Sequence, residues 1–294
     1  MSLSIFSNFR IDSRERLLRM KDSFSSFEGA SIDKWIINAR GPLGDEALQF
    51  LRENVGDKLV EYNIESNGGW MRDTQSMIAA VETDYLLYWI EDQICLCGAD
   101  RLNDVVSEMK LLDAEYMGYS WFGLGTFIAE FDGLSQESLN CMSVVDYDKE
   151  AHKIRLQNSL RVIGTKSAII SLAGIFSKTL FYRLVQDRKF FLRRWPKETP
   201  FDFERLWNDT SVLPLKYGVP KFEIFCTIDD DNQVPGSSLI SRGLYEERQS
   251  REDLLEIRAG AQGKKSFAIL RKIFRRNVMA QRIYRFFVRI SYHF

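Results

Sequence analysis

The amino-acid sequence predicts an α/β fold, in which a mostly parallel sheet is flanked by helices. From residue 3 to residue 121, apolar segments of strand length alternate with amphipathic segments of helix length. Strands joined by helix-length connections require crossovers, which produce a parallel sheet with helices on both faces. The apolar run Tyr85–Ile90 supports this class, because a strand covered on both faces is apolar without interruption.

The expected elements follow from these patterns in chain order. Ser13 is a suitable N-cap for the first helix, because its hydroxyl can accept a hydrogen bond from the first turn. Strands are expected where apolar residues run together, at 3–9, 34–38, 58–63, 85–90 and 115–121. Helices are expected where apolar residues recur on one side, at 14–27, 46–53, 70–81 and 103–112.

Beyond the fifth strand the pattern is less regular. Pro200 opens an expected helix, because proline suits the first turn, and the acids after it favour the helix dipole. The other expected features are a strand at 160–165, a helical stretch at 167–185 interrupted at Gly174, a basic and aromatic run at 188–194, strands within 213–227 and an acidic loop at 228–232.

Composition disfavours several classes of protein. The formal net charge is −1, so no global positive field favours nucleic acid as a partner. The two histidines, His152 and His293, are too few to favour a histidine-based triad or a histidine-rich metal site. No GxGxxG or Walker sequence occurs, which disfavours a Rossmann dehydrogenase and a P-loop kinase.

Cysteine usage and hydropathy indicate a reduced, cytoplasmic protein. All four cysteines lie within or beside apolar segments, and the spacing of Cys95 and Cys97 is not that of a zinc site. A charged helix follows the first strand, where a signal peptide would continue with apolar residues. The longest central apolar run, 168–176, is too short to span a bilayer.

Two adjacent acids, Glu91 and Asp92, follow the apolar run and fall at the carboxyl end of its strand. Ligands of open α/β sheets bind at that edge. Adjacent carboxylates are costly unless a positive group joins them, and a divalent metal with a phosphate would do so. The alternative is a solvated turn at the end of a strand.

Five segments resemble, in order and spacing, the nucleotide-sugar glycosyltransferases of the GT-A fold, most nearly the inverting family-2 type. The resemblance covers roughly residues 2–210, and its segments are Ser4–Arg10, Arg14–Phe27, Ile36–Asn38, Asn67–Gly69 and Tyr85–Gln93. It implies a donor site at the strand ends. The implied donor-binding residues are Asn8 and Asn38 at the base, Asn67 and Gly68 in a close-approach turn, and Asp92 near the sugar. Arg10, Arg40 and Arg72 lie at or near predicted strand-end loops and could add the positive charge that a leaving diphosphate requires.

Each implied role has a structural alternative. Asn8 and Asn38 can be ordinary polar residues at strand ends, and Gly68 can belong to a plain left-handed turn. Trp70, Trp121 and Phe122 are candidates for stacking on a sugar, or for core packing. Asp229 to Asp231 are candidates for a second cation site, or for a solvated loop.

The chain departs from the family at the metal motif, because it has Glu91-Asp92-Gln93 where the family has Asp-x-Asp. The resemblance implies Mn²⁺ or Mg²⁺ at these residues. Glu91 offers carboxylate oxygen, and Asp92 can ligate the metal or contact the sugar. Gln93 offers only a neutral carbonyl, which is a weaker ligand for a hard cation.

The acceptor hydroxyl requires a general base, and a carboxylate is expected because histidine is scarce. The resemblance implies an acid at the start of the helix after the acceptor-binding segment, which matches Glu204 and, second to it, Asp202. The alternative is that these acids only complement the helix dipole.

The resemblance therefore implies a cytoplasmic enzyme that moves a sugar from a nucleoside diphosphate to a glycan or lipid-linked acceptor in bacterial surface polysaccharide synthesis. Residues 1–125 would form the donor-binding half and 126–260 the acceptor-binding half, and homo-oligomers are possible. One alternative is a nucleotidyltransferase that makes activated sugars, although Asn8 to Asp12 lack the glycine-rich loop it would need. Another is a non-catalytic scaffold that binds nucleotide sugars.

The last segment, 261–294, has a separate character. Residues 264–294 carry nine Lys or Arg and no Asp or Glu, which leaves −10 for the rest of the chain. At about 100° per residue, six of these cations lie on one helical face and apolar residues, including Tyr284 and Phe287, lie on the opposite face. This pattern is typical of a helix that lies in an anionic membrane interface, or of one whose apolar face packs against protein.

We expect the full chain to co-sediment with anionic vesicles and a chain ending at Gly263 to remain in solution. Each Lys or Arg near an anionic leaflet contributes about 1 kcal/mol, and added salt screens this attraction. Binding should therefore weaken as salt rises. Equal sedimentation of both chains, or none of the full chain, would show that the tail does not bind membranes.

Overall fold

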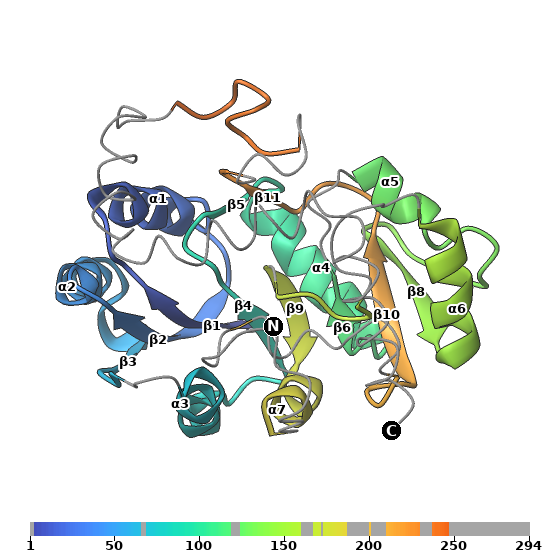
Figure 1. Ribbon diagram of the computed structural model, residues 1–294, viewed down its shortest axis with the longest axis horizontal. Helices are drawn as coiled ribbons and strands as arrows, with labels where there is room; N and C mark the ends of the chain where they lie inside the picture. The colour runs from blue at the N-terminus through green and yellow to red at the C-terminus, as the bar shows by residue number, and fades with distance from the viewer. Residues whose placement is uncertain are drawn as a thin grey trace, which may run out of the picture. The chain divides into compact units, whose positions relative to one another are not determined.

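A sheet of nine strands lies at the centre of the described residues (Figure 1). Its strand order is β3-β2-β1-β4-β9-β6-β10-β8-β7, and β5 and β11 form a separate two-stranded sheet. The strands are β1 (Leu3–Arg10), β2 (Ile32–Arg40), β3 (Leu59–Tyr62), β4 (Tyr85–Tyr88), β5 (Gln93–Cys95), β6 (Tyr116–Met117), β7 (Glu137–Ser138), β8 (Met142–Tyr147), β9 (Gly174–Ser177), β10 (Leu215–Pro220) and β11 (Phe225–Thr227).

The computed structural model describes residues 3–65, 69–118, 124–159, 167–171, 173–186, 200, 210–229 and 237–246. The compact unit that contains them ends at Glu246. The basic tail, the predicted boundary at residue 260 and the expected features at 160–165, 188–194 and 201–209 lie outside the described residues, and these expectations stay predictions.

Strand directions confirm the predicted mostly parallel α/β class. β1 is parallel to β2 and β4, and β2 is parallel to β3. β9 runs antiparallel to both of its neighbours, β4 and β6. β10 is parallel to β6, whereas β8 is antiparallel to β10 and β7. The parallel half therefore contains the first four strands, whose helix-length connections predicted it.

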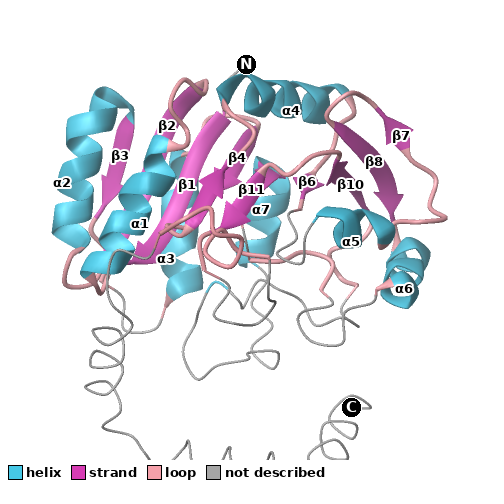
Figure 2. Cartoon of the chain, turned by 90° about the horizontal axis from the view of Figure 1, so that it is seen from above, coloured by secondary structure: helices cyan, strands magenta, loops and turns pink. Residues whose placement is uncertain are grey.

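Helices cover both faces of the sheet (Figure 2). One apolar core lies under α1, α2 and α4, and the other lies under α3, α5, α6 and α7. The α-helices are α1 (Arg14–Ser25), α2 (Gly44–Val55), α3 (Trp70–Met77), α4 (Ala99–Leu111), α5 (Leu124–Ala129), α6 (Lys149–Asn158) and α7 (Lys178–Gln186), with short 3₁₀ turns at Gly56–Lys58 and Ile78–Ala80. Ser13 caps α1 as expected, because its hydroxyl accepts a hydrogen bond from the backbone N–H of Arg16.

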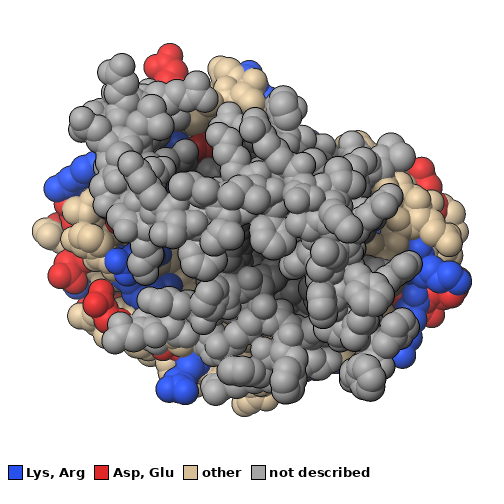
Figure 3. All heavy atoms as spheres, viewed as in Figure 1, with Lys and Arg blue, Asp and Glu red and all other residues tan. Residues whose placement is uncertain are grey.

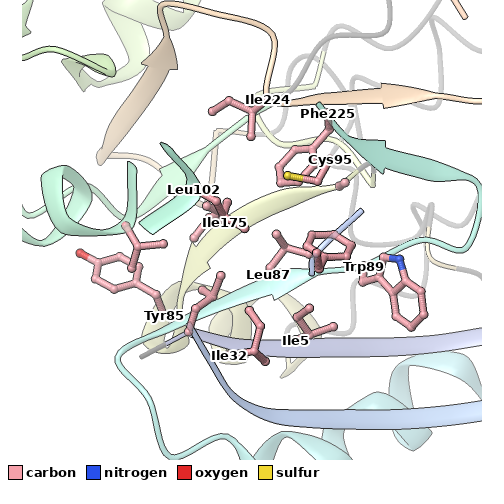
Figure 4. Close-up of a cluster of buried hydrophobic side chains, with 14 of the residues drawn as sticks. Ile5, Ile32, Tyr85, Leu87, Trp89, Cys95, Leu102, Ile175, Ile224 and Phe225 are labelled. Atoms are coloured by element: carbon pink, nitrogen blue, oxygen red, sulfur yellow. The ribbon is translucent and has the colours of Figure 1, made fainter. Parts of the chain in front are cut away.

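Alternation along β1 explains the two cores. Ile5 and Phe9 belong to the core under α1 and α2, whereas Phe6 belongs to the core under α3 and α7. Figure 4 shows part of the first core, in which Ile5 of β1, Leu87 of β4 and Ile175 of β9 lie close together. Within the apolar run predicted at 85–90, residues 85–89 are thus buried from both sides and Ile90 is half-buried.

The middle of the chain differs from the sequence prediction. The stretch 167–185, expected to be one interrupted helix, contains β9 followed by α7, and Gly174 begins the strand. A Cβ atom on Gly174 would lie 3.0 Å from the carbonyl oxygen of Met117, so glycine permits close packing of β9 on β6. The apolar run 168–176 could not be distinguished from a helix by periodicity.

Other element boundaries in the structure also differ from those expected from the sequence. Strand pairing in the expected fifth strand, 115–121, is confined to Tyr116 and Met117 among its described residues, and the helix expected from residue 103 begins at Ala99. The sequence prediction did not contain the elements β5, β7, β8, α5 and α6.

A buried cation holds α6 to the second core. The side chains of Arg155 and Glu130 are 4% and 1% exposed, and the Arg155 Nε donates to Glu130 Oε2 at 3.0 Å. The guanidinium carbon lies 4.9 Å from the ring centroid of Phe131 and 5.2 Å from that of Tyr217. Cation–π attraction and the ion pair together offset the cost of removing this charge from water.

Glu130→Gln should lower the free energy of unfolding by about 3–5 kcal/mol, because it leaves the Arg155 charge buried without its counter-ion. Urea unfolding followed by circular dichroism would measure this change. The control is Glu150→Gln in the Lys153–Glu150 pair, whose side chains are 63% and 67% exposed. That change should cost less than about 1 kcal/mol. Equal effects of the two substitutions would contradict the role assigned to the buried pair.

Candidate functional site

The carboxyl ends of β1, β2 and β4 meet at one edge of the sheet. Arg10 ends β1 directly opposite Arg40, which ends β2. Beyond β4 the chain continues along β1, because the backbone N–H of Trp89 donates to the Phe6 carbonyl at 2.9 Å and the Ser7 hydroxyl donates to the Trp89 carbonyl at 2.7 Å. Glu91 and Asp92 follow and emerge at this edge, where open α/β sheets bind ligands.

Two asparagines join the strand ends to one another. The Asn38 amide donates to the Asn8 side-chain oxygen and to the Ile64 carbonyl, each at 3.1 Å, and its own oxygen accepts from the Ile64 N–H at 3.0 Å. The Asn8 amide donates to the Thr74 hydroxyl at 3.1 Å. Both side chains are buried and bonded within the fold, so they have a positioning role, and their predicted contact with a base stays a prediction.

Trp70 belongs to the same network. Its indole N–H donates to the Asn8 carbonyl at 2.9 Å, and its ring is 1% exposed and packs edge-on against Tyr88. A ring buried in this way packs in the core and does not present a face to a sugar. The structure thus favours core packing for Trp70, whereas the other stacking candidates, Trp121 and Phe122, lie outside the described residues.

The three predicted arginines differ in exposure. Arg10 and Arg72 are exposed, and Arg40 is half-buried. Burial lowers the pKa of Arg40, and the nearby Asp73 carboxylate opposes that shift. The Arg40 Nε is buried and makes no hydrogen bond within the described structure. Arg10 and Arg40 thus bring two positive charges to the same edge, as their positions in the sequence predicted.

Glu91 is 5% exposed and pairs with an arginine of α1. The Arg16 Nη1 lies 3.4 Å from Glu91 Oε1 and donates to the Arg10 carbonyl at 3.0 Å. Burial raises the pKa of the Glu91 carboxyl, and the Arg16 charge partly opposes this rise. The Arg16 side chain is 44% exposed, so its guanidinium lies between a buried acid and the solvent.

Gln93 has a structural role in the described conformation. Its side-chain oxygen accepts a hydrogen bond from the backbone N–H of Ala173 at 2.6 Å, and its carbonyl accepts one from the Ser23 hydroxyl. Gln93 is 1% exposed. Asp92, which lies between Glu91 and Gln93, is half-buried. Its backbone carbonyl accepts a hydrogen bond from the Ile228 N–H at 2.7 Å.

A second arginine of α1, Arg19, links the helix to the segment that contains Asp229. The Arg19 Nε donates to Glu15 Oε1 at 2.8 Å, and its Nη1 lies 3.5 Å from Asp229 Oδ2. Burial opposes ionisation of Arg19, but the Glu15, Asp229 and Asp92 carboxylates raise its pKa overall. Asp229, a candidate for a second cation site, therefore has the Arg19 guanidinium as its neighbour.

Arg16 and Arg19 were not among the predicted site residues. They lie three residues apart on α1, which places them on neighbouring positions of one helical face. That spacing was visible in the sequence, but the acidic segment that they face is about 75 residues further along the chain. Only the pairing of β4 with β1 brings the two segments together.

As arranged, these residues do not fit a metal site. Glu91 pairs with Arg16, and the Gln93 oxygen is already bonded to a backbone N–H. The described residues contain no group of three or more His, Cys, Asp or Glu that would hold a metal ion. Positive charge at this edge comes from arginine side chains, and Mn²⁺ or Mg²⁺ binding stays a prediction.

Several predicted site residues lie outside the described residues. These are Asn67 and Gly68, and the candidate bases Asp202 and Glu204. In the described part of the chain, every helix is too short or too polar to span a bilayer. Figure 3 shows described side chains of both signs at the left and right margins of the face in view.

Comparison with known proteins yields matches among solved structures. No family model matches the chain, and no curated protein matches it. TarS 1-349 of S. aureus matches with 11% identity and a TM-score of 0.47, over 76% of this chain and 60% of that one. The same protein in complex with UDP-GlcNAc matches with 12% identity and a TM-score of 0.47, over 76% and 58%.

A UDP-glucose pyrophosphorylase complexed with UDP-glucose matches with 9% identity and a TM-score of 0.39, over 75% of this chain and 91% of that one. This chain thus covers less than two thirds of TarS 1-349 and most of the pyrophosphorylase. These likenesses concern the fold alone, and they do not decide between functions.

The pKa of Glu91 predicts a pH dependence of stability. Because burial raises this pKa, the folded protein retains a proton that the unfolded chain loses above about pH 4.3. The free energy of unfolding should therefore fall with rising pH, by about 1.4 kcal/mol for each pH unit between the two pKa values. Glu91→Gln lacks this loss, so its stability relative to the wild type should rise as the pH increases above about 4.3.

Urea titrations of both proteins across this range would measure the difference. Arg16→Met provides a second check, because removing the cation should raise the Glu91 pKa further and extend the fall in stability to higher pH. A stability difference between wild type and Glu91→Gln that stays constant with pH would contradict the assignment.

Proposed function

We propose that this protein binds a nucleoside-diphosphate sugar at the edge formed by β1, β2 and β4, and transfers the sugar to a hydroxyl of a glycan or lipid-linked acceptor. The observation that carries the proposal is the Arg16–Glu91 pair at that edge, in which the Arg16 side chain is 44% exposed and the Glu91 side chain is buried. Arg10, also exposed, ends the neighbouring strand. The sequence resemblance to GT-A glycosyltransferases points to the same edge.

The chemistry requires positive charge where the diphosphate leaves. As the bond to the anomeric carbon breaks, negative charge grows on the leaving phosphate oxygens, and fixed cations that face them lower the barrier. The Glu91 carboxylate and the Arg10 carbonyl hold the guanidinium of Arg16 at this edge. Glu204, or Asp202, remains the proposed base that removes the acceptor proton.

A nucleotidyltransferase that makes activated sugars is the second candidate. This chain differs from what such an enzyme would need in the connection after β1, where a glycine-rich loop would be required to enclose phosphates. In this chain only Ile11, Asp12 and Ser13 separate β1 from α1, and Ser13 is occupied as the N-cap. This short connection favours sugar transfer over nucleotidyl transfer. A scaffold would bind the donor without transferring its sugar.

Attachment to a membrane would give this enzyme access to a lipid-linked acceptor. A lipid-linked acceptor is insoluble, so an enzyme on the inner face of the cell membrane would meet both its soluble donor and its acceptor. The basic segment 264–294 is the proposed attachment, and polysaccharide synthesis in bacteria is the proposed setting.

Arg16→Met should weaken binding of the matching nucleoside diphosphate about 10- to 100-fold, because a hydrogen-bonded charged group contributes about 1.5–3 kcal/mol. UDP, GDP, CDP and TDP would first be compared by thermal shift, with Mn²⁺ and with EDTA, because a ligand of the native state raises the melting temperature. Titration calorimetry with the selected nucleotide would then give the affinities.

Arg14→Met is the matched control, because Arg14 lies on the same helix but pairs with Glu46 of α2. Its affinity should equal that of the wild type. Stabilisation by none of the four nucleotides, or equal losses in both variants, would contradict donor binding at this edge. Binding without sugar transfer to any glycan or lipid-linked acceptor would favour the scaffold alternative.

A further inference from the structure

Two thiols lie in contact at the end of β5. The sulfur atoms of Cys95 and Cys97 are 3.8 Å apart and share a hydrogen bond. Cys95 is the last residue of β5 and pairs with Phe225 of β11. Its N–H donates to the hydroxyl of Ser26, the C-cap residue of α1, at 2.9 Å. The strand therefore fixes one thiol, and the other is brought to it by the turn before α4.

The second thiol is accessible. Cys97 is half-buried, its neighbour Leu96 is 39% exposed, and Gly98 is exposed with a φ of +76°. A Cβ atom on Gly98 would meet nothing within 4 Å, so this turn has open space beside it. A small reagent can thus approach the Cys97 sulfur from solvent, and the turn has room to close the remaining distance to Cys95.

The surroundings also favour one thiolate within the pair. The hydrogen bond between the two sulfurs lowers the pKa of Cys95, although burial opposes this, and it raises the pKa of Cys97 together with burial. The pair immediately precedes α4, whose N-terminal dipole stabilises negative charge. A thiolate is the reactive form in thiol–disulfide exchange.

The other two cysteines lack these features. Burial, with the nearby Glu108 carboxylate, raises the pKa of the Cys141 thiol to about 11. Cys226 is fully buried, and its sulfur donates to the Ser237 carbonyl at 3.3 Å. Both thiols are buried away from reagents in solvent, so they should react slowly and serve as internal references.

We propose that Cys95 and Cys97 form a reversible disulfide when the folded protein meets a small-molecule disulfide such as oxidised glutathione. The Cys97 sulfur attacks one sulfur of the reagent, forms a mixed disulfide and releases one glutathione, which takes up the Cys97 proton. The Cys95 sulfur then attacks the Cys97 sulfur and expels the second glutathione with the Cys95 proton. The protein loses two hydrogen atoms, and the reagent is reduced to two glutathione molecules.

The test is exposure of the folded full-length protein to oxidised glutathione, an acid quench and a thiol count in denaturant. The count should fall from four to two and return to four with dithiothreitol. Both cysteines lie in one tryptic peptide, residues 73–101, because no Lys or Arg occurs between Arg72 and Arg101. That peptide should lose the mass of two hydrogen atoms and carry no glutathione.

Two variants separate the steps. Cys95→Ser should stop at a mixed disulfide on Cys97, because it lacks the second thiol. Cys141→Ser is the matched control and should still form the link, with its count falling from three to one. The proposal is overturned if the wild-type peptide 73–101 keeps both thiols, if it retains glutathione on Cys97, or if Cys141 and Cys226 are oxidised as fast as the pair.

Discussion

The hydrogen bonds that β1 makes to β2 and β4 are the constraint on which the candidate site depends. Because all three strands are parallel, their carboxyl ends lie at one edge, and Arg10, Arg40 and Glu91 arrive there from distant parts of the chain. The Asn8–Asn38 bond fixes the register of this edge, and the Trp70 bond to the Asn8 carbonyl attaches α3 to it. Polar groups that are satisfied inside the fold hold such an edge more firmly than exposed ones.

The sequence predicted the first half of the fold because each element there has its own periodic signal. The run at 85–90 is apolar on every residue, and the helices around it are capped or amphipathic, so local and global preferences agree. The prediction failed at Gly174, where an apolar run has the same appearance in a helix and in a buried strand. What placed that run in the sheet was its packing between β4 and β6, which is a property of the assembled fold.

The candidate site was predictable as a place but not as a set of contacts. Strand ends revealed Glu91 and the arginines Arg10 and Arg40, because a strand end is visible in the sequence. The role of Gln93 was not visible, since its partner is a backbone N–H of Ala173, which has no signature in side-chain pattern. Arg16 was missed for a related reason, because a basic residue on a helix acquires meaning only from the acid that tertiary structure places beside it.

The Arg16–Glu91 pair is unequal in a way that bears on ligand binding. Burying the Glu91 carboxylate costs several kcal/mol. Attraction to Arg16, whose side chain is 44% exposed, offsets only part of this cost. Any anion that approaches Arg16 from solvent competes with Glu91 for the same guanidinium. As the anion draws the cation away, the buried acid loses its counter-charge and its affinity for a proton rises further. Anion binding and proton uptake at this edge are therefore coupled through one side chain, and an anion should bind more tightly at lower pH, where Glu91 no longer needs the arginine.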